Sequence, residues 1–364
     1  MESVIKTAFP FIVFAIGILI AFQGVLMIVA YTVLAERKVL GWIQGRIGPN
    51  RVGPWGILQP FADLLKFIFK EDIVPDKSTK FVYYLAPLIA LTCALLPIVV
   101  YPFAPAITTV DWNFLPFGLG EGIKQLPLTI SQIDVGVLYV LGITSVGVYG
   151  IALAGWSSNN KYSLMGGLRS SAQMISYELA MGASVIGVVM LAGTLDLNGI
   201  IMAQANSPWY MKWYIIPQFI GFVVFLIAAF AETNRVPFDL PEAETELVAG
   251  FHTEYSALKF ALFFMAEYVN MFTVSVMVVT LFLGGWYTPG IGHIFEVGTI
   301  PYAIASHVGF LLKICFFLFF YIWVRGTLPR FRFDQLMNFG WKFLLPVALA
   351  NVVLTIVIVY FLNR

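Results

Sequence analysis

The feature that most constrains this chain is a series of apolar runs, each about as long as a bilayer is thick. About 20 consecutive apolar residues in a helix cross the hydrocarbon core of a membrane, and the elements of a soluble core need far fewer. Hydrophobic residues make up 60% of the 364 residues, and charged residues only 11%. The sequence therefore predicts an all-α, polytopic membrane protein and not a soluble enzyme.

The apolar runs predict eight transmembrane helices within one integral membrane domain, residues 1–364. The expected spans are 11–35, 81–101, 134–155, 173–193, 215–232, 262–284, 305–324 and 343–361. The first run lacks a small-residue cleavage pattern, so we expect it to remain as a helix and not to be removed as a signal peptide.

Lysine and arginine are concentrated in every second loop. Of the 21 basic residues, sixteen lie in the loops after spans one, three, five and seven, four lie on the other side, and Lys313 lies inside span seven. Basic loops remain on the cytoplasmic side of a membrane. We therefore expect both termini outside, with the first loop (36–80) and the acidic loop (232–261) inside.

The segment LQPFADLLKFIFKED predicts an amphipathic helix within the first inside loop. Its apolar residues follow helical spacing, while Asp63, Lys66 and Lys70 share the opposite face. Such a helix lies along the membrane surface. It either closes the bundle as a structural element or borders an access path for an amphiphilic molecule.

Three glutamates, Glu178, Glu232 and Glu267, lie inside consecutive expected spans, all near the inner surface. A carboxylate at such a depth is costly unless it is paired, protonated or hydrated, and it is a candidate for an ion or proton pathway. The alternative is that each turns toward a helix end or a neighbour. Lys313, near mid-membrane, is expected either to pair with these acids through water or to lock helices together.

Several classes of function find no support in the sequence. The cysteines (Cys93 and Cys315) and histidines (His252, His293 and His307) form no recognisable metal or iron–sulfur ligand set. Glycine-rich nucleotide-binding motifs and a Ser/His/Asp arrangement are also missing. The near balance of 21 basic and 20 acidic residues gives no sign of nucleic-acid binding. We therefore expect no metal or flavin in this chain, so any electrons would travel through other subunits.

Four long motifs carry a resemblance to a known family. They read AERKVLGWIQGRIGPNRVGPWGILQPFADLLKFIFKED, GWSSNNKYSLMGGLRSSAQMISYELA, AETNRVPFDLPEAETELVAGFHTEYSALKFALFFMAEY and RGTLPRFRFDQLMNFGWK. From about Glu36 to Trp341 the chain resembles the H subunit of proton-pumping NADH-quinone oxidoreductase, the equivalent of subunit 1 of mitochondrial complex I. The eight expected spans agree with this resemblance.

The resemblance implies a chamber through which ubiquinone or menaquinone reaches the last iron–sulfur cluster, and a carboxylate relay that couples quinone reduction to proton translocation. For the quinone chamber it implies Glu36, Arg37, Trp42, Arg46, Asp63, Arg235 and Arg325. For the relay it implies Glu178, Glu232, Asp239, Glu242, Glu244, Glu246 and Glu267, to which the charge pattern adds Lys313. Quinone is then the substrate.

The resemblance also implies partners and a location. The partners are other subunits of the complex: the peripheral quinone-site and iron–sulfur subunits and the small membrane subunits beside the antiporter-like pumps. Membrane lipid surrounds the spans, and no nucleic acid is involved. A bacterial plasma membrane is the expected location, with an organellar inner membrane as the alternative.

The chain departs from some family members in the third span. Those members have a further glutamate where ITSVGVYG has Thr144 and Ser145. Water, Asp134 or an acid of a partner subunit is expected to take its place. The four-glutamate version of the relay is therefore not expected in this chain.

Three other functions compete with this interpretation. The first is the homologous membrane subunit of a membrane-bound hydrogenase, or of a dehydrogenase fed by ferredoxin or a reduced deazaflavin. The second is a self-sufficient cation or proton transporter, since such proteins also use acids and lysines inside the membrane. The third is a purely structural anchor. The complete ERK…RIGPNRVGP block and the FDLPEAETE loop favour a quinone-reducing type.

Overall fold

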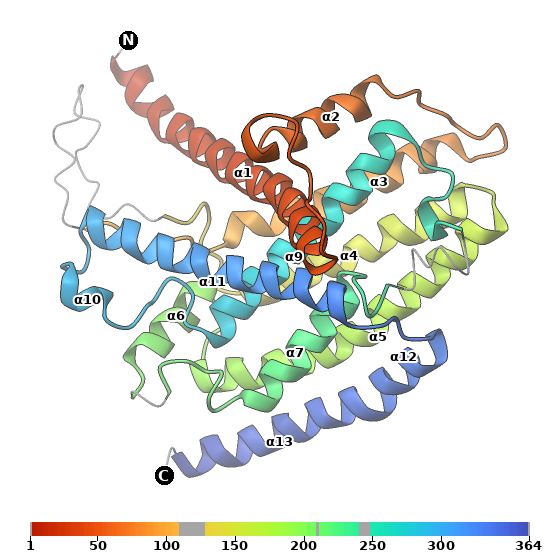
Figure 1. Ribbon diagram of the computed structural model, residues 1–364. Helices are drawn as coiled ribbons and strands as arrows, with labels where there is room; N and C mark the ends of the chain where they lie inside the picture. The colour runs from red at the N-terminus through yellow and green to blue at the C-terminus, as the bar shows by residue number, and fades with distance from the viewer. Residues whose placement is uncertain (1, 109–127, 209–210, 240–247, 363–364) are drawn as a thin grey trace.

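A computed structural model of the chain describes residues 2–108, 128–208, 211–239 and 248–362, with the backbone alone for 2–14. These residues form helices joined by turns and short loops (Figure 1). Among them, seven helices are long and apolar enough to cross a membrane. This confirms the all-α, polytopic class predicted from the apolar runs.

The long helices follow the expected spans in order. They are α1 (Glu2–Ile43), α3 (Lys80–Leu95), α4 (Gly136–Ser157), α5 (Lys161–Ala192), α7 (Phe219–Glu232), α9 (Ala257–Phe282), α11 (Ile300–Thr327) and α13 (Leu345–Leu362). The 3-10 turn η2 (Leu96–Val100) extends α3, and the π turn η6 (Gly340–Leu344) joins α12 (Phe333–Phe339) to α13. The remaining elements are η1 (Pro54–Gly56), α2 (Gln59–Phe69), α6 (Leu197–Asn206), η5 (Gly250–His252) and α10 (Ile291–Ile294).

The fifth expected span, 215–232, is shorter than the sequence predicts. Its helix, α7, has 14 residues, which at 1.5 Å per residue is roughly 21 Å and less than the ~30 Å hydrocarbon core. It is not among the seven helices that meet the length for a span. The difference arises because residues 211–218 form turns and not helix.

Helix α5 begins well before the expected span 173–193. Asn160 starts it, because its side-chain oxygen accepts a hydrogen bond from the Tyr162 amide at 2.9 Å and satisfies one of the free N–H groups of the first turn. At the other end, Gly193 adopts a φ of 70° and terminates the helix. Much of the expected loop between spans three and four is therefore the first part of α5.

Close contacts between small residues hold α4 against α5. A Cβ added at Gly155 would lie 2.6 Å from the Ser163 carbonyl oxygen and 3.1 Å from the Cα of Gly167. Only glycine permits this approach, and small residues at helix interfaces serve the same purpose in other membrane bundles.

Four of the connecting segments meet at one end of the bundle. The Ile73 amide bonds the Ser256 hydroxyl at 2.9 Å, and the Thr79 amide bonds the Ser157 carbonyl at 3.1 Å. The Phe331 amide bonds the Pro237 carbonyl, also at 3.1 Å. These contacts join the loops that the positive charges assign to the inside. Helix α1 begins, and α13 ends, on the opposite side (Figure 1).

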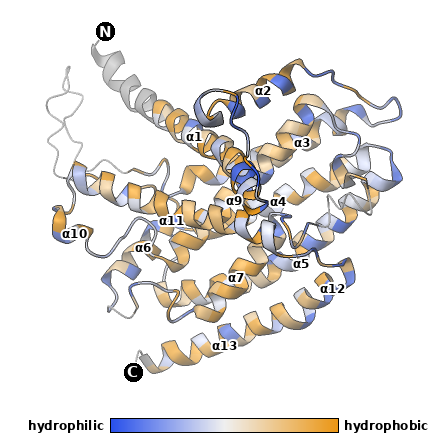
Figure 2. Cartoon of the chain, viewed as in Figure 1, coloured by the Kyte–Doolittle hydropathy of each residue, from blue (hydrophilic) through white to orange (hydrophobic). Residues whose placement is uncertain are grey.

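Figure 2 shows hydrophobic residues along most of the long helices and hydrophilic ones gathered near α2 and the neighbouring loops. This polar end, made by the segments after α1, α4, α7 and α11, is called the inner end below. It contains most of the candidate site.

Candidate functional site

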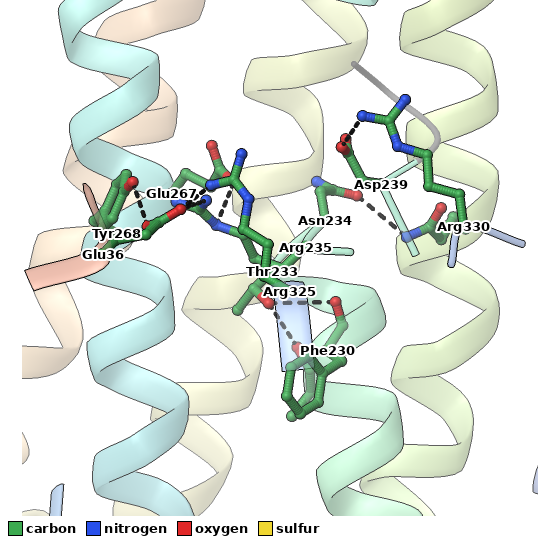
Figure 3. A network of polar contacts seen from close by, with 12 residues as sticks. Glu36, Phe230, Thr233, Asn234, Arg235, Asp239, Glu267, Tyr268, Arg325 and Arg330 are labelled. Atoms are coloured by element: carbon green, nitrogen blue, oxygen red, sulfur yellow. Dashed lines mark hydrogen bonds and ion pairs between the residues drawn. The ribbon is translucent and has the colours of Figure 1, made fainter. Parts of the chain in front are cut away.

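A cluster of charged side chains lies at the inner end, where four separate elements meet (Figure 3). Glu36 comes from α1, Glu267 and Tyr268 come from α9, Arg325 comes from α11, and Arg235 follows α7. Glu36 is 4% exposed and Arg235 is 5% exposed. Two carboxylates and two guanidinium groups balance in charge, as buried ionised groups require. We call these five residues the ion-pair cluster.

Arg235 is the centre of the ion-pair cluster. Its Nε lies 2.8 Å from Oε1 of Glu267, and its Nη1 lies 3.4 Å from Oε1 of Glu36. The guanidinium carbon also lies 4.2 Å from the centre of the Tyr268 ring, in a cation–π arrangement. Burial alone would lower the pKa of Arg235. The nearby Glu267, Tyr268 and Glu36 raise this pKa by more than burial lowers it, so the pKa lies well above its ordinary value. Arg235 is therefore a permanent cation.

Glu36 joins the remaining members. Its Oε1 is also ion-paired with Arg325, and its Oε2 accepts a 2.6 Å hydrogen bond from the Tyr268 hydroxyl. Three of the residues predicted for a quinone chamber (Glu36, Arg235 and Arg325) thus share one cluster with Glu267, which was predicted for the relay.

Glu232, the last residue of α7, lies beside this cluster and faces a pocket. Its side chain is buried, and its Oε2 accepts no hydrogen bond from the residues that the structure describes. The pocket and the open space at its mouth have an empty volume of about 660 Å³ together. Its lining is Ala90, Gly147, Ile151, Met174, Glu232, Thr233, Asn234, Phe251, His252, Phe260, Phe263, Phe264, Ala266, Glu267 and Asn270. Glu232 and Glu267 therefore share one cavity, which we call the acid pocket.

Several residues of the acid pocket were not predicted from the sequence. Asn270 lies one turn after Glu267 on α9, and its Oδ1 likewise accepts no hydrogen bond from the described residues. An amide inside an apolar run, three positions after an acid, was a usable signal because such residues share one helix face. One wall of the pocket is made of phenylalanines: Phe251, Phe260, Phe263 and Phe264. The sequence has 33 phenylalanines, so nothing in it distinguishes these four from the rest.

Glu178 lies on α5 and is partly buried. Its Oε1 accepts a hydrogen bond from the Ser145 hydroxyl of α4. Glu178 and the Thr144 hydroxyl both lie close enough to Glu232 to affect its charge. Asp134, considered as a substitute for the family glutamate, is exposed and precedes α4 at its outer end.

The start of the acidic loop is well anchored. Oδ2 of Asp239 pairs with Nη2 of Arg330 at 2.9 Å, and Asp239 is 4% exposed (Figure 3). The Gln173 side chain of α5 donates to the carbonyls of Ala231 at 2.8 Å and Phe238 at 2.7 Å. The other predicted loop acids, Glu242, Glu244 and Glu246, lie outside the described residues.

The other predicted chamber residues lie on the last part of α1, in the turn after it and on α2. Asp63 of α2 pairs with Arg37 of α1 at 2.6 Å and accepts a 3.0 Å hydrogen bond from Gln59. Trp42 is 66% exposed, and Arg46 is exposed with its Nε 2.8 Å from Oε1 of Gln44. These four residues therefore line a surface and do not join the ion-pair cluster.

Helix α2 matches the amphipathic helix predicted from LQPFADLLKFIFKED. No residue within it is buried in the chain. Its exposed apolar side chains are Phe61, Leu64, Leu65, Ile68 and Phe69. An apolar face of this kind is suited to lipid or to an amphiphile.

Lys313 lies on α11, away from the inner end. Its ammonium donates to the carbonyls of Leu283 at 2.9 Å, Gly285 at 2.9 Å and Tyr287 at 2.8 Å, which directly follow α9. An ammonium has three N–H donors, and these contacts engage all of them. The expected pairing with a relay acid is not what the structure shows. Its role in proton transfer stays a prediction.

Comparisons with known proteins agree on one family. The family model described as NADH dehydrogenase matches residues 16–356. A relative in Koribacter versatilis, named as an H subunit of NADH-quinone oxidoreductase, is 54% identical over 90% of this chain and 91% of its own length. Subunit 8 of the same enzyme in Rhodothermus marinus is 50% identical over 92% and 95%. The H subunit of the enzyme in Leptospira biflexa is 51% identical over 91% and 90%.

Proposed function

Because this chain belongs to the NADH dehydrogenase family, we propose that it couples quinone reduction to proton translocation in a bacterial NADH-quinone oxidoreductase. In this proposal the chain provides part of a quinone chamber and the first acids of a proton path. Its partners carry the redox centres and most of the pumping machinery. The bacterial relatives favour the plasma membrane as its location.

The surface between α1 and α2 supports the quinone part of the proposal. It exposes large apolar side chains, among them Trp42, Phe61 and Leu65, which suit an isoprenoid tail. The Arg37–Asp63 pair and Arg46 lie at the same surface and could orient a polar headgroup. Partner subunits would close the chamber over this surface.

Arg235 supports the coupling part most directly, because its guanidinium contacts acids of both predicted sets. Glu36 belongs to the chamber set, and Glu267 lines the acid pocket together with Glu232. Charges about 4 Å apart interact by about 4 kcal/mol at an effective dielectric constant near 20. A change of charge on a nearby quinone would strengthen one of the two ion pairs of Arg235 and weaken the other. The position of the guanidinium charge would then change, and with it the electric field at Glu232.

Glu232 is the acid whose protonation this field would control. It is buried, and within the described chain its Oε2 has no donor, so no contact of that oxygen fixes its charge and a change in the local field can move its proton. Glu267, by contrast, is held by a permanent cation. We therefore assign the proton-carrying step to Glu232 and Glu178 and an electrostatic step to Glu267.

The test is Glu267→Gln in the assembled complex, in sealed vesicles, with assembly checked on a native gel. Quinone-reductase activity and proton pumping should both fall, because Arg235 loses one of its two acids. Glu296→Gln is the matched control, since Glu296 is exposed in the segment before α11. Unchanged activity and proton stoichiometry in an assembled Glu267→Gln complex would contradict the proposal.

A further inference from the structure

Two adjacent hydroxyls of α4 lie between acids that belong to two other helices. Ser145 donates a hydrogen bond to Glu178 of α5, and the Thr144 hydroxyl lies close enough to Glu232 of α7 to stabilise its charged form. Thr144 is buried and Ser145 is partly buried. Neighbouring positions on a helix point about 100° apart, so one helix can face both acids at once.

The two hydroxyls also share a backbone acceptor. The carbonyl of Leu141 receives a 3.0 Å bond from Thr144 and a 2.9 Å bond from Ser145. Their oxygens are therefore at most about 6 Å apart, a gap that a single water can bridge. Each hydroxyl has a carbonyl behind it and a carboxylate in front of it, so each can turn its proton either way.

We propose that the hydroxyls of Thr144 and Ser145 form the proton link between Glu232 and Glu178. This inference rests on the proposed function and adds to it the route between the two acids. Protonated Glu232 gives its proton to the Thr144 oxygen as the Thr144 proton passes to a bridging water. The water passes a proton to Ser145, and the Ser145 proton passes to the Glu178 carboxylate. One proton moves, and the hydroxyls and the water end neutral.

A role confined to α4 itself would not need this arrangement. Serine and threonine inside a helix satisfy themselves by bonding the carbonyl three or four residues earlier, and both residues do so here. Their contacts with acids of α5 and α7 come in addition to that bond. Those contacts are the ones a transferred proton would use.

The test compares two double variants of the complete complex in sealed vesicles. Thr144→Val with Ser145→Ala removes both hydroxyls, and Thr144→Ser with Ser145→Thr keeps them while changing the packing. Ser184→Ala is a further control, because Ser184 is a buried hydroxyl of α5 that bonds the carbonyl of Met181. Turnover, protons pumped per NADH and the solvent deuterium isotope effect are measured for each.

The hydroxyl-free variant should lose at least about tenfold in pumping-coupled turnover, since positioned proton transfer contributes 10²–10⁴-fold. Its isotope effect should rise, and the hydroxyl-retaining variant and Ser184→Ala should stay near the parent. Equal losses in both double variants would indicate packing and overturn the link. If the hydroxyl-free variant has normal turnover while Glu232→Gln and Glu178→Gln have reduced turnover, the link through Thr144 and Ser145 is overturned but the proposed function is not. Normal turnover in the hydroxyl-free variant, Glu232→Gln and Glu178→Gln alike would overturn the proposed function as well.

Discussion

At the scale of single residues, the depth of a charge in the membrane did not reveal its partner. Glu267 was predicted as a relay acid from its position in a span, and the structure pairs it with Arg235, which lies in the preceding loop. Glu36 and Arg325 are 289 positions apart and form an ion pair. Such contacts depend on how helices are arranged, which no local pattern in the sequence records.

Replacing Arg235 should destabilise the protein strongly. Arg235→Met leaves Glu36 and Glu267 with less compensation inside a buried cluster, and removing one partner of a buried pair costs about 3–5 kcal/mol. We expect a lower thermal midpoint and less assembled complex on a native gel. Adding Glu267→Gln should restore part of the loss, because it removes one uncompensated charge.

Arg51→Met is the control for that experiment, because Arg51 is an exposed cation of the first loop. If Arg235→Met behaves like Arg51→Met, the ion-pair cluster contributes nothing to stability. The structural basis of the coupling proposal would then be lost.

Asp63 should behave differently from the buried acids. Its pair with Arg37 is solvated, with side-chain exposures of 46% for Arg37 and 24% for Asp63, and exposed pairs contribute about 0–1 kcal/mol. We expect Asp63→Asn to leave the thermal midpoint within experimental error while raising the KM for quinone. A parental KM and midpoint together would place Asp63 outside the quinone path.

At the scale of elements, the end of α9 shows that the apolar pattern of a span does not predict which groups bond the carbonyls at the end of its helix. The sequence predicted the span 262–284, and α9 ends at Phe282. Its last carbonyls would be left unsatisfied, and an unsatisfied backbone group is costly where water is excluded. Gln204 of α6 donates to the carbonyls of Thr280 at 2.9 Å and Leu281 at 3.3 Å, and the Ile215 amide donates to that of Phe282 at 2.9 Å. Beyond the end of α9, Lys313 donates to the carbonyls of Leu283, Gly285 and Tyr287.

This arrangement separates two roles for Lys313. Capping predicts that Lys313→Met lowers the thermal midpoint and the yield of complex, since three carbonyls lose their donor, while protons pumped per NADH in the surviving complex stay constant. A relay role predicts the reverse: normal assembly with a lower proton stoichiometry. Pumping stoichiometry measured at matched amounts of assembled complex distinguishes them.

Helix α6 is an element that the sequence analysis missed although a signal for it was present. Asp196 begins it, and the Asp196 carboxylate accepts hydrogen bonds from the amides of Asn198 at 3.3 Å and Gly199 at 2.8 Å. Aspartate before a short helix is a common N-cap. With 10 residues, α6 is too short to form the ~20-residue apolar run that predicts a span. The amphipathic α2 was predicted because its apolar spacing is regular.

At the scale of the whole molecule, the order of the long helices was predicted correctly because the membrane itself requires long apolar runs. Hydrocarbon demands long apolar helices, so the order of the helices followed from the sequence. The candidate site was predicted only as a set of residues. Its division into an ion-pair cluster, the acid pocket and the α1–α2 surface depends on loops such as 233–239, whose paths are set by contacts with Gln173 and Arg330.

The orientation of the whole chain gives the last prediction. The four loops that meet at the inner end hold sixteen of the 21 basic residues, and basic loops are retained in the cytoplasm. Lys77→Cys in the first loop should therefore react with a membrane-impermeant thiol reagent only in inverted vesicles, and Glu296→Cys only in right-side-out ones. The native Cys93 and Cys315 lie within α3 and α11, so the parent chain measures the background. Labelling with the opposite sidedness would place Arg235, Glu232 and the acid pocket at the outer surface, where a quinone reduced from the cytoplasmic side could not act on them.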